Sequence, residues 1–448
     1  MFEKYFSVLD ILIAIIWLVI LVIVLSNHLQ KIENDQIKGY FLKNYFFKAF
    51  FSLFFTVIYY FVLGGGDTQA YWDGAIVLNK LFFRSPTLYF EHLMMPPNQV
   101  AYIKHFNIQT GYPPGWIYRE IEGWFICKLT SVVSLFTFRS LPATLLIFAY
   151  FISTASFRVF EVVVKIGLHS TRTAAWCLLF VPSVAFWCTG ISKDSVMFWT
   201  ILSLISIFLN LFIFRKRLSF LTILAILFFF FLIINIRSFT LAAILAPLLV
   251  AFSARASNQF SSAFARISLR FIFILVGLVG FLYIGSSSYM AELANEAAVI
   301  QQDFSNNPIY TGKRYNIDIS DPSPAGMLRA FPVSVFFGVY KPFIYEALSP
   351  SLLFNGIEST ILLFMTLNFL FNGNPIKKIN WIFKNEFLVF SLFFVLLIGF
   401  MAGYTSVLFG VLVRIRAPLL PFVFLLFTTK SELQIQDGVK EINKPSTD

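Results

Sequence analysis

The sequence predicts an all-α, polytopic integral membrane protein, and its composition, hydropathy and apolar segment lengths all favour this class. Of its 448 residues, 58% are apolar and only 13% are Asp, Glu, Lys or Arg, about half the charged share of a soluble domain. Mean hydropathy is +0.78. This composition leaves too little polar surface for a soluble enzyme and is also unlike a disordered chain or a disulfide-rich secreted module.

About eleven apolar segments follow one another along a single membrane domain, residues 1–448, each long enough to cross about 30 Å of hydrocarbon. We expect the first to remain in the protein, because it is too long for a signal peptide and no small-residue cleavage site follows it. The expected spans are 8–26, 47–64, 141–157, 173–191, 195–213, 219–236, 238–254, 270–288, 350–372, 387–406 and 410–428.

The placement of Lys and Arg sets the expected orientation of the spans. If the N-terminus lies outside, every inside segment carries basic residues, for example Lys48 and the run 215–217. Basic residues in short loops favour the cytoplasmic side, so the tail 430–448 is expected in the cytoplasm. This orientation explains the net charge of +11 without nucleic acid, which we do not expect as a partner.

Two segments, 65–140 and 289–349, are too long and too polar to be simple turns, and both fall outside in this topology. Within the first, 124–138 carries apolar residues at helical spacing. We expect it to lie as a helix in the outer membrane interface, with a twelfth span as the alternative. Function is expected in these loops, because the spans are committed to lipid and to one another.

The cysteines and histidines form no metal-binding pattern in the sequence. Cys127, Cys177 and Cys188 lack metal-ligand spacing, and the four histidines are scattered, so we expect the cysteines to serve packing. No cofactor is required by the sequence, although a carboxylate at the membrane surface could hold a divalent cation against a phosphate.

The sharpest local motif is GGGDTQAYWD, residues 64–73, directly after the second expected span. Its glycines break the helix at the membrane surface and permit a tight turn. Asp67 and Asp73 are therefore candidate catalytic residues, as general base or as metal ligand. Tyr71 lies between them and is a candidate substrate contact. In the alternative interpretation, Asp67 caps a helix that starts at Thr68.

Basic and acidic side chains occur together near the expected outer ends of the spans. A charge between apolar helices is costly unless it meets water, a partner or a ligand, and Glu358 inside a span requires a cation. Cations beside carboxylates at one depth favour a site for a phosphate or diphosphate headgroup, with ordinary snorkelling as the alternative. Besides Tyr71, the candidate substrate-binding residues are Arg119, Lys128, Lys193, Asp194, Arg237, Lys341, Glu346, Arg414 and Arg416.

This layout resembles the GT-C superfamily of integral-membrane glycosyltransferases, which use polyprenyl-phosphate or polyprenyl-diphosphate sugars at the outer face. Members carry an acidic residue in the first large external loop, which also contains interfacial helices and often a Pro-Pro element. Asp67 matches the acidic position, and Tyr112-Pro113-Pro114 and the segment 124–138 match the rest of that loop. The resemblance implies that Asp67 is catalytic.

A second resemblance covers most of the chain. It is to a group of polytopic membrane proteins of Bacteroidetes that carries no established activity, and it implies a multi-pass protein of the bacterial cytoplasmic (inner) membrane. The similar strings are GGGDTQAYWDGA, VPSVAFWCTGISKDS, VYKPFIYEAL with a following IES, and FGVLVRIRAPLLPF.

Three functions are consistent with these features. The first is a glycosyltransferase that moves a sugar from a polyprenyl-linked donor to a glycan or lipid acceptor, with Asp67 as base or metal ligand. The second is a polymerase or ligase of surface polysaccharide in the cell envelope. The third is a non-enzymatic transporter, flippase or assembly subunit, for which internal repeats and polar residues at mid-membrane would be typical. The membrane lipid is a partner in all three.

The topology gives a direct prediction. Single cysteines introduced at Asn98 and at Lys216 should be labelled from opposite sides of the membrane by a reagent that cannot cross it, because the first lies in the expected outer loop and the second in an inside loop. Labelling of both from the same side would contradict the topology.

Overall fold

The computed structural model describes residues 5–258, 323–347 and 349–429, with isolated positions between 262 and 317. Regular secondary structure in these residues is helical, and their β-type pairings are two isolated bridges. Eight helices within them are long and apolar enough to cross a membrane. These are Val8–Leu29, Asp35–Val62, Leu141–Ile166, Lys193–Phe212, Phe220–Arg237, Leu352–Phe371, Glu386–Thr405 and Phe409–Phe427.

The all-α prediction is confirmed for the described residues, and the eight helices are consistent with a polytopic membrane protein and overlap eight of the expected spans. The expected span 173–191 is divided into two short helices, α10 (Thr171–Leu179) and α11 (Pro182–Trp187). Pro182 occupies the first turn of α11, and a proline there cannot donate the hydrogen bond that would continue the preceding helix.

Three other expected segments remain, two spans and the C-terminal tail. The expected span 238–254 lies within α14 (Phe239–Asn258), whose apolar part, Thr240–Ser253, is shorter than a full span. The expected span 270–288 and the tail 430–448 lie outside the described residues. The described helices therefore leave the total number of spans open.

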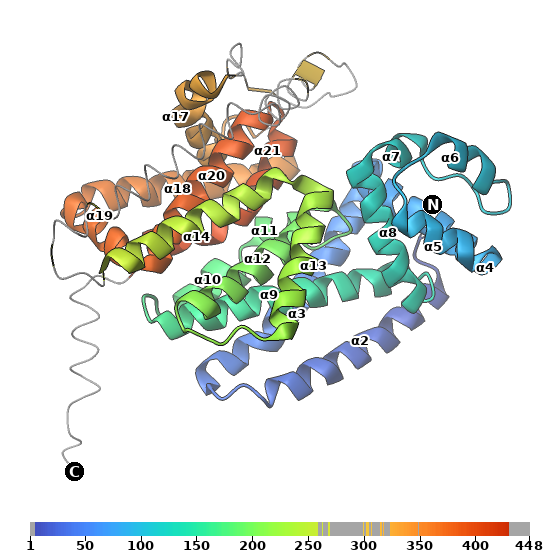
Figure 1. Cartoon of the computed structure of the whole chain (residues 1–448), viewed down its shortest axis with the longest axis horizontal. Coiled ribbons are helices and arrows are strands. Elements are labelled where there is room, and N and C mark those ends of the chain that lie inside the picture. The colour runs from blue at the N-terminus through green and yellow to red at the C-terminus, as the bar shows by residue number, and fades with distance from the viewer. Residues whose placement is uncertain are drawn as a thin grey trace. The chain divides into compact units, whose positions relative to one another are not determined.

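The chain divides into two compact units. The first comprises residues Met1–Val162, Leu178–Leu211 and Lys216–Leu241, and the second comprises Val163–Cys177, Phe212–Arg215 and Ala242–Asp448. Figure 1 shows the helices of both. Besides α11, the first unit contains α2 (Val8–Leu29), α3 (Asp35–Val57) with its π-helical continuation η1 (Ile58–Val62), α4 (Gly66–Arg84), α5 (Pro86–Met94), α6 (Gln99–His105), α7 (Gly115–Arg119), α8 (Ile121–Phe136), most of α9 (Leu141–Ile166), most of α12 (Lys193–Phe212) and α13 (Phe220–Arg237).

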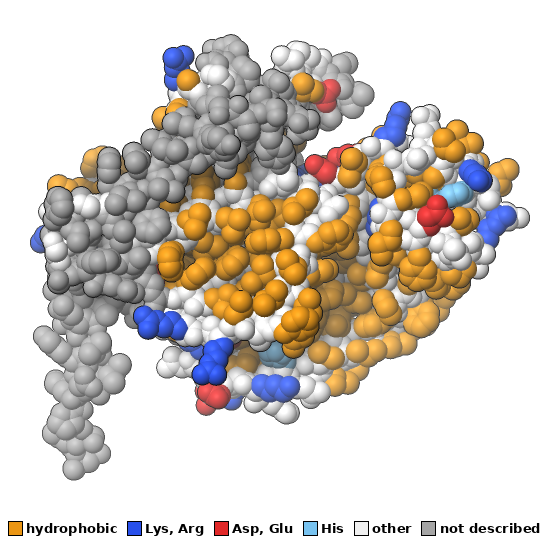
Figure 2. Space-filling model, in the orientation of Figure 1, with side chains coloured by type: hydrophobic (Ala, Val, Ile, Leu, Met, Phe, Trp, Pro, Cys, Tyr) orange, Lys and Arg blue, Asp and Glu red, His pale blue; other side chains and the backbone are white. Residues whose placement is uncertain are grey.

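Hydrophobic side chains cover much of the outer surface of these helices, as Figure 2 shows for one face of the molecule. Only 17% of the most apolar part of α2 and 22% of that of α13 is buried. In water such a surface would drive aggregation, whereas in a bilayer it is the favourable contact with lipid. The exposed apolar faces therefore support a membrane location.

Polar contacts join the spans of the first unit where they pack. The Asn44 side-chain amide of α3 donates to the Ser153 carbonyl of α9 at 2.8 Å, and the Ser52 hydroxyl donates to the Thr189 carbonyl at 2.8 Å. Such bonds satisfy buried groups that lipid cannot. Lys48 lies between Asn44 and Ser52 on α3, fully buried, rather than in the inside loop that the sequence suggested.

Helix α4 contacts the ends of two spans of the first unit, those of α2 and of α3 with η1. It begins four residues after η1 ends. At its middle, Asp73 accepts a hydrogen bond from Tyr5, just before α2. Ser140, just before α9, donates to the Asp10 carbonyl in the first turn of α2 at 2.8 Å. Helix α4 also packs against η1 and α8, which places it beside the ends of these spans.

The second unit is built around α20 (Glu386–Thr405). Helix α17 (Pro324–Tyr340), which falls in the expected loop 289–349, packs closely along α20. A Cβ at Gly338 would lie 1.9 Å from the Gly399 carbonyl oxygen, so only glycine permits this approach. The other described helices of this unit are most of α10 and of α14, then α18 (Pro350–Phe371), α19 (Pro375–Lys384), α21 (Phe409–Arg416), η2 (Ala417–Leu419) and α22 (Leu420–Phe427).

Candidate functional site

Three glycines form the turn that precedes Asp67, which lies in the first turn of α4. Gly64, Gly65 and Gly66 all adopt positive φ, at 78°, 99° and 63°, a region that residues with a side chain rarely enter. The helix begins at Gly66, and its N-cap is Gly65, which makes no side-chain cap. The alternative in which Asp67 caps a helix starting at Thr68 is therefore wrong. Asp67 is instead an acid within the first turn, where the helix dipole favours negative charge.

The Asp67 carboxyl lies partly buried among charges of both signs. Burial raises its pKa above the ordinary aspartate value, and this is the largest effect. The positive charges of Lys193 and Arg237 lower the pKa, whereas the negative charges of Glu120 and Asp194 raise it. The net direction is upward, so Asp67 holds a proton to higher pH than an exposed aspartate would.

Lys193 connects α12 to the segment before α8. It is the first residue of α12, and its ammonium donates to Glu120 and, at 3.0 Å, to Glu122. The Lys193 side chain is 13% exposed, whereas Glu120 and Glu122 expose 41% and 47% of theirs. The lysine is thus nearly buried, and its two partners reach solvent.

Arg237 and Asp194 form the more buried ion pair of the site. The Arg237 guanidinium lies 2.7 Å from the Asp194 carboxylate, with side-chain exposures of 20% and 8%. Asp194 is in the first turn of α12, and Arg237 is the last residue of α13. Each charge is therefore at the helix end whose dipole stabilises it, and the pair joins the ends of two spans.

These residues form one charged group, which we call the Asp67 cluster: Asp67, Glu120, Glu122, Lys193, Asp194 and Arg237. Tyr71, one turn after Asp67, is buried beside it. The pKa of its phenol is raised well above the usual value, by burial first and then by Asp67, Glu120 and Asp194. Tyr71 therefore stays protonated and can donate a hydrogen bond. Carboxylates outnumber cations in the cluster.

Glu120 and Glu122 were not among the candidate residues from the sequence. Glu120 is the N-cap of α8, and Glu122 lies in its first turn. Two acids two residues apart at the start of an apolar helix were the available signal. The sequence does not show that they pair with Lys193, because that lysine is more than 70 residues away along the chain.

Other predicted residues of the first unit lie in different surroundings. Asp73 accepts a hydrogen bond from the Tyr5 hydroxyl at 3.4 Å. It lies six residues after Asp67, which places it on a different face of α4. Arg119 is exposed and donates to the Gly115 carbonyl within its own helix. Lys128 donates to the Met95 carbonyl at 2.7 Å, and burial lowers its pKa to about 8.

The remaining predicted residues belong to the second unit and have partners within it. Lys341 pairs with Glu346 and lies over the Phe337 ring, 4.7 Å from its centroid. Arg416 is fully buried and donates to the carbonyls of Val339, Lys341 and Asn355 and to the Ser359 hydroxyl. Arg414 lies in the same short helix, α21. The contacts of Arg416 join α17, α18 and α21, which is a structural role.

The described residues around Asp67 do not form a site for the divalent cation that its position suggested. Among the described residues, no three His, Cys, Asp or Glu side chains are arranged to hold a metal ion. Three of the carboxylates of the Asp67 cluster, those of Glu120, Glu122 and Asp194, are paired with Lys193 or Arg237 instead. We therefore derive no step through a metal.

The charges around Asp67 predict shifts of opposite sign in its titration. Glu120→Gln removes a negative charge and should lower the pKa of Asp67, whereas Lys193→Gln removes a positive charge and should raise it. The pKa can be followed by the infrared carbonyl band of the protonated carboxyl, assigned by its loss in Asp67→Asn. Glu33→Gln is the control, since Glu33 lies at the far end of the Asp35–Val62 span, roughly 40 Å away. Equal shifts in all three variants would contradict the cluster.

In comparisons with known proteins, no protein-family model, no curated protein and no solved structure matches the chain.

Proposed function

We propose that the chain is a membrane glycosyltransferase that transfers a sugar from a polyprenyl-phosphate or polyprenyl-diphosphate donor to an acceptor at the outer face of the bacterial cytoplasmic membrane. The observation that carries the proposal is the Asp67 cluster. It combines a carboxyl of raised pKa with a lysine whose partners reach solvent. It also lies at the ends of membrane-spanning helices, the depth at which a lipid-linked donor presents its phosphate.

The reaction requires a base on one side of the sugar and a cation on the other. In the proposed step, Asp67 accepts the proton of the acceptor hydroxyl as that oxygen attacks the anomeric carbon. The bond from the anomeric carbon to the phosphate oxygen breaks, and the phosphate leaves with the bonding electrons. A general base is most effective when its pKa is close to the working pH, and burial moves the pKa of Asp67 in that direction.

Lys193 is the cation that fits the leaving phosphate. Its partners, Glu120 and Glu122, are 41% and 47% exposed, so both can turn to water when a phosphate approaches. Withdrawal of these carboxylates also reduces the repulsion that an anionic donor would meet. A positioned cation stabilises charge that develops on a departing group. Lys193 is therefore assigned to the donor phosphate.

Arg237 has a different role in this proposal. Its partner Asp194 is 8% exposed, and separating a buried pair leaves an uncompensated charge at a cost of several kcal/mol, about 3–5. The pair therefore stays intact during the reaction. Arg237 and Asp194 act as positioning residues that hold the N-terminus of α12, and with it Lys193, in place.

Replacement of Asp67 tests the proposal. Asp67→Asn should reduce transfer of labelled sugar from polyprenyl-linked donors in membrane vesicles by more than about a hundredfold, because an amide cannot take the proton and general-base catalysis supplies roughly 10²–10⁴-fold. Glu91→Gln is the matched control, because Glu91 is an exposed acid on α5. Parent-like transfer by Asp67→Asn would remove Asp67 from the mechanism.

The same variant should not lose stability. A raised pKa in the folded state means that Asp67 favours folding below the ordinary aspartate pKa of about 3.9 and loses this contribution as pH rises through the raised value. At neutral pH, Asp67→Asn should thus unfold at the same or a higher temperature than the parent. A markedly lower unfolding temperature would assign Asp67 a structural role instead.

A further inference from the structure

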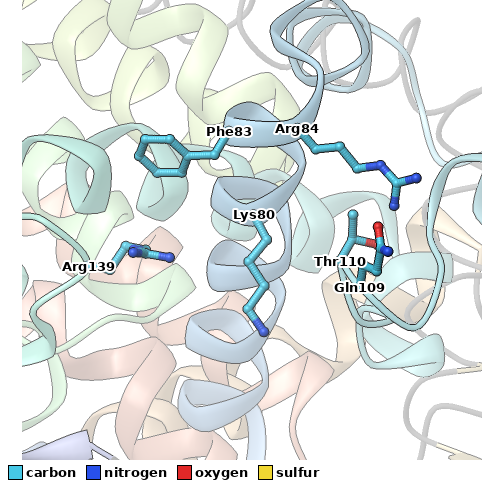
Figure 3. A pocket seen from close by; sticks show the side chains of 6 residues that line it. All are labelled: Lys80, Phe83, Arg84, Gln109, Thr110 and Arg139. Atoms are coloured by element: carbon cyan, nitrogen blue, oxygen red, sulfur yellow. The ribbon is translucent and has the colours of Figure 1, made fainter.

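A second charged feature of the first unit lies away from the Asp67 cluster. It is a pocket of about 420 Å³ lined by Lys80, Phe83, Arg84, Gln109, Thr110 and Arg139. The pocket joins the last turns of α4 to the loop before α7 and to the turn between α8 and α9 (Figure 3). Lys80 is thirteen residues after Asp67 on the same helix, about 20 Å along its axis, so the two sites are distinct.

Among the residues that the structure describes, none of the three cations of this pocket forms an ion pair with an acid. Arg84 donates to the neutral side-chain amide of Asn107 at 2.9 Å. The Arg139 guanidinium lies 5.3 Å from the centroid of the Phe83 ring, and Lys80 has no ion pair in the described part of the chain. In contrast, Lys193 and Arg237 each pair with an acid. The pocket is therefore a concentration of uncompensated positive charge.

The cations that line the pocket come from two elements: Lys80 and Arg84 belong to α4, and Arg139 belongs to the turn between α8 and α9. In Figure 3, Lys80 lies between Arg139 on one side and Arg84 with Gln109 and Thr110 on the other. The Asn107 side chain fixes the loop, since it accepts from the backbone of Gln109 and Thr110 as well as from Arg84. Like charges that line one pocket repel each other, and an anion bound in the pocket reduces that repulsion. Arg fits phosphate particularly well, because its donors form a planar fork.

The pocket lies at the membrane surface. Arg139 is two residues before the span Leu141–Ile166, and the neighbouring Ser140 contacts the first turn of the span Val8–Leu29. Phe83, Phe136 and Phe138 are each at least 67% exposed beside it. Apolar side chains next to a basic pocket suit a ligand with a phosphate at the surface and acyl or prenyl chains in the bilayer.

From this placement we propose that the pocket formed by Lys80, Arg84 and Arg139 binds the phosphate headgroup of an anionic membrane lipid. The lipid phosphate lies between the three cations, and its chains run past Phe83 and Phe138 into the hydrocarbon. This site is independent of the proposed transferase activity, since none of its residues belongs to the Asp67 cluster.

Native mass spectrometry of the purified full chain can measure this binding, with phosphatidylglycerol as the probe and phosphatidylcholine as the neutral comparison. Replacing Lys80, Arg84 and Arg139 together with Gln should weaken phosphatidylglycerol binding by tenfold or more, as expected for loss of charge-assisted contacts. Phosphatidylcholine binding should not change. All three side chains are exposed, so the fold should be retained, and Lys80→Gln alone, which breaks no hydrogen bond, should show a smaller loss.

The matched control replaces Arg215, Lys216 and Arg217 with Gln, which removes the same charge from the loop between α12 and α13. Equal loss in this control, or parent-like binding by the Lys80, Arg84 and Arg139 variant, would overturn the proposal. Inorganic phosphate identifies the source of the phosphate. If millimolar inorganic phosphate fails to displace the lipid, the ligand is a lipid headgroup. If micromolar phosphate displaces it, the ligand is instead a free phosphate compound, and the lipid proposal is overturned.

Discussion

The ion pair between Arg237 and Asp194 is the interaction on which the candidate site depends. It joins the last residue of one membrane-spanning helix to the first turn of another, with both charges largely buried. Lys193 is adjacent to Asp194, so the pair also fixes the position of the lysine that holds Glu120 and Glu122. Through these contacts the N-terminus of α12 is joined to the start of α8 and to the end of α13. The resulting charges surround Asp67 of α4. The arrangement keeps several charges stable where an apolar bilayer would otherwise exclude them.

The membrane explains which parts of the fold could be predicted from sequence. A span must be apolar over about 20 residues and must satisfy its own backbone hydrogen bonds, and both requirements are visible in composition. The first span is therefore found at Val8–Leu29, close to its expected bounds. The division of the segment 173–191 depends on one residue, Pro182. That position was visible, but hydropathy alone does not weigh a proline against an apolar run.

The candidate site was less predictable, because a charge can be located in sequence but its partner cannot. Asp67 was identified from its glycine-rich neighbourhood, and Lys193, Asp194, Arg237 and Tyr71 do gather beside it. Lys341 and Arg416 have the same sequence signal, a basic residue near the end of a span. They contact a carboxylate and backbone carbonyls of the second unit. Only tertiary structure distinguishes a cation that joins helices from one that can exchange its partner for a ligand.

In the proposed mechanism, Lys193 exchanges its glutamate partners for the donor phosphate while Asp67 faces the acceptor. A structure of the protein with a non-hydrolysable polyprenyl-phosphate sugar analogue tests this most directly. We expect a phosphate oxygen within hydrogen-bonding distance of the Lys193 ammonium, Glu120 and Glu122 turned to solvent, and the Arg237–Asp194 pair intact. An analogue bound elsewhere, with Lys193 still held by both glutamates, would contradict it.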